Sequence, residues 1–262
     1  MKKNFSYVEP KNSLDNRIRA HLSFSNFSLH EWIEKNLNIS SGDKILDMGC
    51  GNGNFLDLFL KMTNKKCEIY AVDKNEDLIL EAKSQYRNEN IIFEVNDFDK
   101  VNIENKQFDW IFFIYSIYYS QKPQELISKM HSYLNGGGHL VIIGPGKSNA
   151  IELDNLNHKI TGLNPKPEYR ERQKRIEDEF YKLSKEIFGK SNSELNILNN
   201  RLTFPNEIDY ANYYWSTLLW RDSLERLESF DEKKLKEKSL IEIKNLNNFI
   251  INKQVSTLIV KK

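Results

Sequence analysis

Short apolar runs separated by segments of helical periodicity constrain the fold of this chain more than any other feature of its sequence. Between the runs, apolar residues recur at helical spacing, first over 54–63 and then over 76–85 and 123–134. Strands that do not alternate between apolar and polar residues, and that helices separate, are typical of a parallel sheet covered on both faces. The sequence therefore predicts an α/β fold whose first five strands are Lys44–Met48, Glu68–Val72, Ile91–Val95, Phe108–Ile114 and His139–Ile143.

The pattern changes after Gly146. The charged segment Tyr169–Phe188 repeats apolar residues at helical spacing, which indicates a helix with one apolar face. This helix either packs on the surface of the domain or caps an active-site mouth, and both interpretations stay open. We expect a sixth strand over Leu195–Phe204 and mostly helical structure over Asn206–Phe230. Gln254–Val260 alternates as an edge strand does.

Composition excludes several classes of protein. Hydrophobic residues make up 39% of the 262-residue chain and charged residues 29%, which is the balance of a globular protein. The formal net charge of +1 provides no long-range attraction for a polyanion. Cys50 and Cys67 are too few for a disulfide framework and lack metal-ligand spacing, so we predict no metal and a reduced, cytoplasmic setting. No signal peptide or membrane span is predicted, because the longest apolar run, Trp110–Tyr115, is strand-sized.

A glycine-rich loop follows the first strand. The strand delivers Asp47 at its carboxyl end, and Gly49, Gly51 and Gly53 follow before a helix begins. Glycines here allow a sharp turn and the close approach of a ligand to the backbone. Their alternate spacing differs from the G-x-G-x-x-G of dinucleotide enzymes. The loop therefore predicts a ligand site that is not a dinucleotide site of the G-x-G-x-x-G type.

Carboxylates also follow the second and third strands. Asp73 ends the second strand in the segment AVDKN, and Asp97 follows the third in the segment NDF. Ligands of open parallel sheets bind beyond the carboxyl ends of the strands, where a carboxylate can accept hydrogen bonds from ribose hydroxyls. Taken singly, Asp47 could instead cap a helix and Asp73 could form a turn. Three strand ends with suitable chemistry in the right order favour a nucleoside site.

On these residues the chain resembles the class I S-adenosylmethionine-dependent methyltransferase family over roughly 37–146. The resemblance implies a Rossmann-like, doubly wound, mostly parallel seven-stranded sheet whose last strand is antiparallel. It also implies S-adenosyl-L-methionine as cofactor and S-adenosyl-L-homocysteine as product. The implied cofactor-binding residues are Asp47, Gly49, Cys50, Gly51, Gly53, Asp73, Lys74, Asp97, Phe98 and Ile114.

With this family in view, we interpret 1–262 as a single methyltransferase domain. Residues 1–36 form N-terminal cap helices, and 37–146 form the cofactor-binding half. A helical cap insertion after the fifth strand covers 147–194, and 195–262 completes the sheet. Arg17 or Arg19 in the first helix could pair with the methionine carboxylate, unless that helix face is simply solvated. His21 is the one histidine that we retain as a functional candidate.

Methyl transfer needs alignment of the acceptor with the methyl group, and a base where the acceptor is protonated. The end of the fourth strand holds Tyr115, Tyr118 and Tyr119, which we predict to bind the substrate. Tyr115 is the catalytic candidate, since a tyrosine can orient an acceptor and attract a sulfonium by its ring. Tyr118 or Tyr119 could instead pack under the following helix. Cys50 is interpreted as a small residue fitted into the loop and not as a nucleophile.

The acceptor is inferred from motifs that the sequence lacks and from one aromatic segment. No Asp/Asn-Pro-Pro-Tyr/Phe tetrapeptide follows the fourth strand, which argues against amino-methylation of DNA bases. No concentrated basic stripe appears either, so a nucleic-acid acceptor is not favoured. The aromatic segment Tyr210–Trp220 could wall an apolar pocket or could be core. We predict an enzyme that methylates an oxygen or nitrogen of a small molecule. An RNA or protein methyltransferase, a non-catalytic cofactor-binding member and a nicotinamide oxidoreductase stay open as alternatives.

Overall fold

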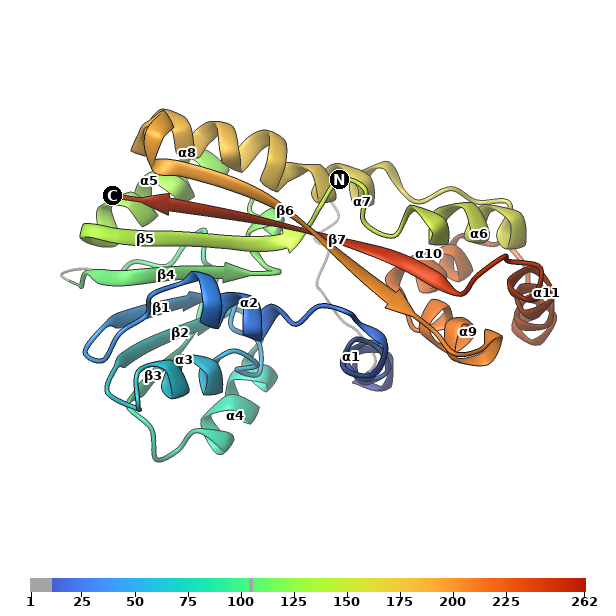
Figure 1. The fold of residues 1–262 in the computed structure, drawn as a ribbon, viewed down its shortest axis with the longest axis horizontal. Coiled ribbons are helices and arrows are strands. Elements are labelled where there is room, and N and C mark those ends of the chain that lie inside the picture. The colour runs from blue at the N-terminus through green and yellow to red at the C-terminus, as the bar shows by residue number, and fades with distance from the viewer. Residues whose placement is uncertain (1–10, 104–105) are drawn as a thin grey trace. The chain divides into compact units, whose positions relative to one another are not determined.

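The computed structural model describes residues 11–103 and 106–262, so the part of the predicted N-terminal cap before residue 11 lies outside the described residues. Seven strands form one sheet in the order β3-β2-β1-β4-β5-β7-β6 (Figure 1). The strands are β1 Lys44–Met48, β2 Glu68–Asp73, β3 Ile91–Val95, β4 Phe108–Ile114, β5 Leu134–Pro145, β6 Ser193–Thr203 and β7 Ile250–Lys261.

The first five strands are parallel, and the strand order reverses between β1 and β4. β1 pairs with β2 on one side and with β4 on the other, and both pairings are parallel. β7 pairs with β5 in the antiparallel direction, with Ile142 opposite Leu258. This confirms the prediction that the last strand is antiparallel. The expectation that Gln254–Val260 lies at the edge is wrong, because β6 follows β7 in the sheet and takes the edge position.

The fifth strand begins earlier than predicted, at Leu134, so Gly136, Gly137 and Gly138 lie inside β5. The pairing of β4 with β5 shifts register between Phe108 and Trp110, opposite this segment. A Cβ on Gly138 would lie 3.0 Å from the carbonyl oxygen of Phe108. The irregularity is therefore a bulge in which the two backbones approach closely, and glycine permits that approach.

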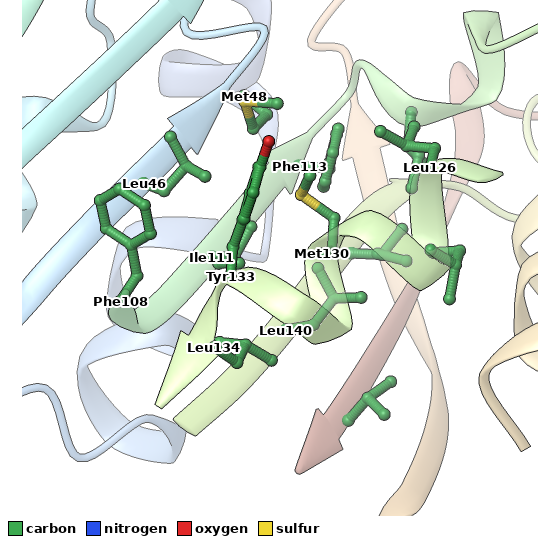
Figure 2. Close-up of a cluster of buried hydrophobic side chains, with 14 of the residues drawn as sticks. Leu46, Met48, Phe108, Ile111, Phe113, Leu126, Met130, Tyr133, Leu134 and Leu140 are labelled. Atoms are coloured by element: carbon green, nitrogen blue, oxygen red, sulfur yellow. The ribbon is translucent and has the colours of Figure 1, made fainter. Parts of the chain in front are cut away.

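Helices cover both faces of the sheet, which confirms the doubly wound fold. On one face, Leu46, Ile111 and Phe113 of the strands pack with Met130 of α5 (Figure 2). Alternate residues of the same strands pack on the other face, against a different set of helices. The chain has two compact units, and the first comprises residues 29–147, 170–198 and 255–262. The α-helices wholly within it are α2 Leu29–Asn36, α3 Leu56–Met62, α4 Glu76–Gln85, α5 Pro123–Tyr133 and α8 Tyr181–Phe188, together with the short helix η1 Ile117–Tyr119 and the turn η3 Lys190–Asn192.

The predicted helix over Tyr169–Phe188 consists of α7 Pro167–Arg175, a π-helical turn η2 Ile176–Phe180 and α8. Ile176, Phe180 and Phe188 are buried on the same face of the sheet as Leu46 and Met130. The wider π turn shifts the buried face by one position, so Ser184 is buried and Leu183 is only partly buried. From residue 176 onward, this segment packs as a surface helix does.

The other compact unit comprises the described residues up to 28 with 148–169 and 199–254. β6 and β7 contribute residues to both units. The predicted insertion 147–194 is thus divided between them, and its interpretation as a cap stays a prediction.

The second unit has its own aromatic core. Tyr210, Tyr213, Tyr214 and Trp220 are all buried, so the aromatic segment that could have walled a pocket is core. The carbonyl oxygen of the Asn157 side chain accepts hydrogen bonds from Tyr214 and Ser223. The helices of this unit are α1 Lys11–Phe24, α6 Ile151–Thr161, α9 Glu207–Trp215, α10 Leu218–Arg226 and α11 Glu232–Lys244.

Candidate active site

The loop after β1 is held to the end of β2. The backbone N–H groups of Gly49 and Cys50 both donate to the carbonyl oxygen of Val72, at 2.7 and 3.0 Å. Gly49 has a φ of +80°, and a Cβ there would lie 2.4 Å from the Cβ of Ser116. Glycine is therefore required at this position by both the backbone conformation and the space.

The other two glycines of the loop differ in their surroundings. Gly53 is crowded, because a Cβ there would lie 2.9 Å from both Tyr86 and Leu56. Gly51 has a φ of +57°, and its nearest such contact is Leu78 at 4.0 Å. The backbone at Gly51 therefore has an open side that a ligand can approach.

Asp73 connects two of the strand ends. One carboxylate oxygen accepts from the N–H of Gly51 at 2.9 Å, and the other accepts from the N–H of Asn75 at 2.8 Å. The Asn75 side chain then caps α4 by accepting from the N–H groups of Asp77 and Leu78. Each carboxylate oxygen of Asp73 can accept two bonds, so the group keeps acceptor capacity for hydroxyls.

Burial changes the protonation of two side chains in this loop. Burial, followed by the nearby charge of Asp73, raises the pKa of Asp47 to about 7. Burial also raises the pKa of the Cys50 thiol above its ordinary value. A thiol that keeps its proton is a poor nucleophile, which fits the interpretation of Cys50 as a small space-filling residue.

Asp97 organises the loop after β3. Its backbone carbonyl accepts from the N–H groups of Lys100 and Val101, and its side chain accepts from the N–H of Asp99 at 3.0 Å. The ring of Phe98 packs edge-on against Phe113 with centroids 5.8 Å apart. Phe98 thus presents its backbone to the loop, while its ring joins the core.

The chain leaves β4 through a strained residue. Ile114 is buried, whereas Tyr115 is 44% exposed and has a φ of +55°, a conformation uncommon for a bulky side chain. The N–H of Tyr115 donates to the carbonyl of Ile143 on β5 at 2.8 Å. Ser116 then donates to the carbonyl of Met48 at 2.7 Å, so the turn is attached to the strands on both sides.

Tyr118 and Tyr119 are partly buried, with ring centroids 4.8 Å apart. A Cβ on Gly144 would lie 3.0 Å from the Tyr118 ring, so Tyr118 packs closely on the end of β5. The guanidinium of Arg175 donates to the carbonyls of Tyr118 and Ser120 at 2.7 and 2.8 Å. Sequence reasoning gave no role to Ser116, although it lies among the tyrosines at the end of the fourth strand. It missed Arg175, which belongs to no motif and is more than fifty residues away along the chain.

Arg17 and His21 have contacts within their own unit. Arg17 donates to the carbonyl of Ser216 at 2.8 Å, and the His21 ring lies edge-on to Tyr213. Burial, with Lys253 and Arg17 nearby, lowers the pKa of His21 to about 3. Arg19 and Lys74 are exposed. A pairing of Arg17 or Arg19 with a cofactor carboxylate stays a prediction.

The match to known families covers most of this site. A family model described as a methyltransferase domain matches residues 39–194, which is more than half of the chain. The chain belongs to the class I S-adenosylmethionine-dependent methyltransferase family. The predicted family and cofactor class are thereby confirmed.

Individual relatives of this methyltransferase are distant. A probable cobalt-precorrin-6B C(15)-methyltransferase (decarboxylating) of Saccharolobus solfataricus is 29% identical over 135 residues, covering 48% of this chain and 62% of that protein. The biotin biosynthesis bifunctional protein BioHC of Teredinibacter turnerae is 26% identical over 122 residues, covering 44% of this chain and 21% of that protein. The chain thus spans less than two thirds of the length of these curated relatives.

A solved structure supports the fold of this methyltransferase. The YcgJ protein from Bacillus subtilis aligns with a TM-score of 0.53 at 13% identity, covering 89% of this chain and 97% of that one. None of the helices in the described part of the chain is both long and apolar enough to cross a bilayer.

The residues present fit the family's cofactor. The open side of Gly51 allows close approach to the backbone, and Asp73 beside it retains acceptor capacity. Among residues 11–103 and 106–262, no group of three or more His, Cys, Asp or Glu side chains is arranged to hold a metal ion.

Proposed function

We propose that this protein transfers a methyl group from S-adenosylmethionine to an oxygen or nitrogen of a small molecule. One observation carries the proposal: the hydrogen bond from the Gly51 N–H to Asp73 fixes the glycine loop to the end of β2. This loop follows β1, the strand that borders the point where the strand order reverses. Open α/β sheets bind ligands at such a point. When bound, the cofactor supplies an activated methyl group on a sulfonium.

The proposed cofactor residues divide into three groups. The loop from Asp47 to Gly53, with Cys50 inside it, lies against the methionine portion. Asp73 accepts from the ribose hydroxyls, with Lys74 beside it. Asp97 and the backbone of Phe98 face the adenine, and Ile114 closes the apolar side. These roles are supported by the order of the strand ends and by the fixed position of the Asp73 carboxylate.

Tyr115 is the proposed catalytic residue, with Tyr118 and Tyr119 at the acceptor site. The assignment of Tyr115 is supported by its left-handed backbone conformation at the end of β4. A bulky residue adopts this conformation only when its surroundings hold it there. The turn is held by the bond from Ser116 to Met48 of β1 and by the bonds from Arg175 to the backbone of the turn, so Tyr115 projects from a supported base. Its ring can favour a sulfonium and its hydroxyl can orient an acceptor.

Calorimetry with S-adenosylhomocysteine tests the cofactor site. Asp73→Asn keeps the shape and one acceptor oxygen but removes the charge, and we expect it to weaken binding by about 1–3 kcal/mol. Asp77→Asn is the matched control, because Asp77 is an exposed carboxylate at the start of the same helix. Equal affinity of wild type and Asp73→Asn would remove Asp73 from the site.

A radiolabelled methyl donor tests the acceptor class. Purified protein is incubated with labelled S-adenosylmethionine and either a small-molecule extract, total RNA or a protein extract. Label in the small-molecule fraction, decreased in Tyr115→Phe, is the expected result. Label confined to RNA or to protein would contradict the small-molecule acceptor, and cofactor binding with no transfer to any fraction would indicate a non-catalytic member.

The cellular setting is part of the same proposal. Cys50 and Cys67 are both buried free thiols. A reducing, cytoplasmic environment keeps such thiols reduced.

A further inference from the structure

One arginine lies beside the acceptor side of the proposed site, in contact with an aromatic ring of the turn after β4. The guanidinium carbon of Arg172 lies 5.3 Å from the centroid of the Tyr119 ring. Tyr119 belongs to that turn, and its N–H donates to the carbonyl of Ser116. Arg172 is therefore placed next to the turn that begins at Tyr115.

Several hydrogen bonds fix the turn that contains Tyr119. The hydroxyl of Ser120 donates to Asp99 at 2.5 Å, and the N–H of Gln121 donates to the same carboxylate at 2.7 Å. Arg175 holds the turn from the side of α7 through its bonds to Tyr118 and Ser120. A cation placed against such a turn keeps a defined position, which is what recognition of a charged substrate group needs.

The charged residues of 171–179 other than Arg172 are all paired. Lys174 pairs with Glu171, and Arg175 pairs with Glu179. Lys147 lies within ion-pair distance of both Glu177 and Asp178. Each carboxylate between 171 and 179 therefore has a cationic partner other than Arg172.

Among the side chains that the structure describes, no carboxylate lies within ion-pair distance of Arg172. A ring contact offsets part of the charge of a guanidinium but gives its N–H donors no strong acceptor. A carboxylate or a phosphate supplies two oxygens in the geometry that a guanidinium prefers.

We propose that Arg172 binds an anionic group, a carboxylate or a phosphate, carried by the small-molecule acceptor. This inference rests on the proposed function, because it places the acceptor beside Tyr115 and Tyr119. The anion serves for recognition, so no bond to it forms or breaks. The attraction between this anion and Arg172 would hold the acceptor at a fixed position beside the turn after β4.

Nuclear magnetic resonance titrations of the protein with S-adenosylhomocysteine test this inference. The probes are acetate, inorganic phosphate and acetamide at constant ionic strength. The signals observed are the Arg172 Nε–Hε resonance, assigned by its loss in Arg172→Gln, and the Tyr119 ring. We expect saturable shifts with acetate or phosphate and none with acetamide.

The variants separate recognition from general surface charge. Arg172→Gln should raise the apparent Kd for the anion about tenfold or more, read from the Tyr119 ring. Arg172→Lys should recover part of the affinity, since it keeps the charge and loses the planar donors. Lys174→Gln, which removes a paired cation of the same helix, should leave the Kd unchanged.

The outcomes are distinct. Tighter binding of acetate indicates a carboxylate acceptor, tighter binding of phosphate indicates a phosphorylated one, and either supports the proposal. Non-saturating shifts, equal shifts with acetamide or an unchanged Kd in Arg172→Gln would overturn it, as would an Arg172 dependence seen only with an RNA oligonucleotide. Calorimetry with S-adenosylhomocysteine on the same samples reports separately on the proposed function, because Arg172→Gln should retain that affinity.

Discussion

The carboxylate of Asp73 accepts a hydrogen bond from the backbone N–H of Gly51 at 2.9 Å, and this contact fixes the glycine loop to the end of the neighbouring strand. Gly51 and Asp73 are separated by more than twenty residues in the chain. The parallel pairing of β1 with β2, which sets Met48 opposite Val72, brings them together. The geometry of the loop therefore depends on sheet register as well as on its own glycines, and substitutions in either should change it.

Gly49→Ala should destabilise the protein because its new Cβ would meet the Cβ of Ser116 at 2.4 Å with the backbone in a left-handed conformation. We expect the free energy of unfolding in urea to fall by about 2–4 kcal/mol. Gly42→Ala is the control, because Gly42 also has a positive φ but a Cβ added there would have no atom within 4 Å. A double variant with Ser116→Gly should recover part of the loss, and an equal loss in the Gly49 and Gly42 variants would contradict the steric explanation.

Asp47→Asn should alter how stability depends on pH. The folded-state pKa of Asp47 is raised to about 7 from 3.8, so its favourable contribution is complete below about pH 4 and is lost as the pH rises through 7. Wild type should therefore lose up to about 4 kcal/mol relative to Asp47→Asn between pH 4 and pH 8. Unfolding free energies measured across this range check the prediction, with Asp77→Asn as the exposed control. Parallel curves for wild type and Asp47→Asn would contradict it.

Arg175→Met should loosen the turn after β4. The substitution keeps much of the apolar stem but removes the donors to the carbonyls of Tyr118 and Ser120. We expect the free energy of unfolding to fall by about 1–3 kcal/mol, since two partly buried acceptors lose a charged donor. Hydrogen exchange of peptides covering 115–121 should become faster. Lys182→Met, at an exposed position of the following helix, is the control, and unchanged exchange in Arg175→Met would show that the turn is held by other contacts.

His21→Gln should make the protein less sensitive to mild acid. The folded-state pKa of His21 is lowered to about 3 from 6.5, so its contribution to stability is present above pH 6.5 and is lost as the pH falls toward 3. Between pH 6.5 and pH 5, wild type should lose about 1–2 kcal/mol relative to the variant. Thermal unfolding at several pH values measures this difference. His30→Gln is the matched control because His30 is exposed, and it should follow the wild-type curve.

Local pattern was sufficient for the strands and for most helices near the site. The predicted helix over Glu76–Gln85 and the strand over Ile91–Val95 match the structure residue for residue. These elements are short, strongly patterned and bounded by turn residues such as Asn75. Local pattern was insufficient for Gln254–Val260. Alternation between apolar and polar residues does not show whether a strand lies at the edge of a sheet or has a further strand, here β6, beside it. It also missed the π turn at Ile176, which shifts the buried face of the helix.

The amino-acid sequence by itself determined the family, the order of the strands' acidic ends and the glycines of the loop, because these depend on residue type and on spacing along the chain. Only the tertiary structure decided that Tyr115 adopts a left-handed backbone and that Arg175 and Arg172 meet the turn that follows it. The physical reason is that a hydrogen bond or a ring contact depends on distance in space. Residues more than fifty positions apart become neighbours only after the sheet and its helices have packed.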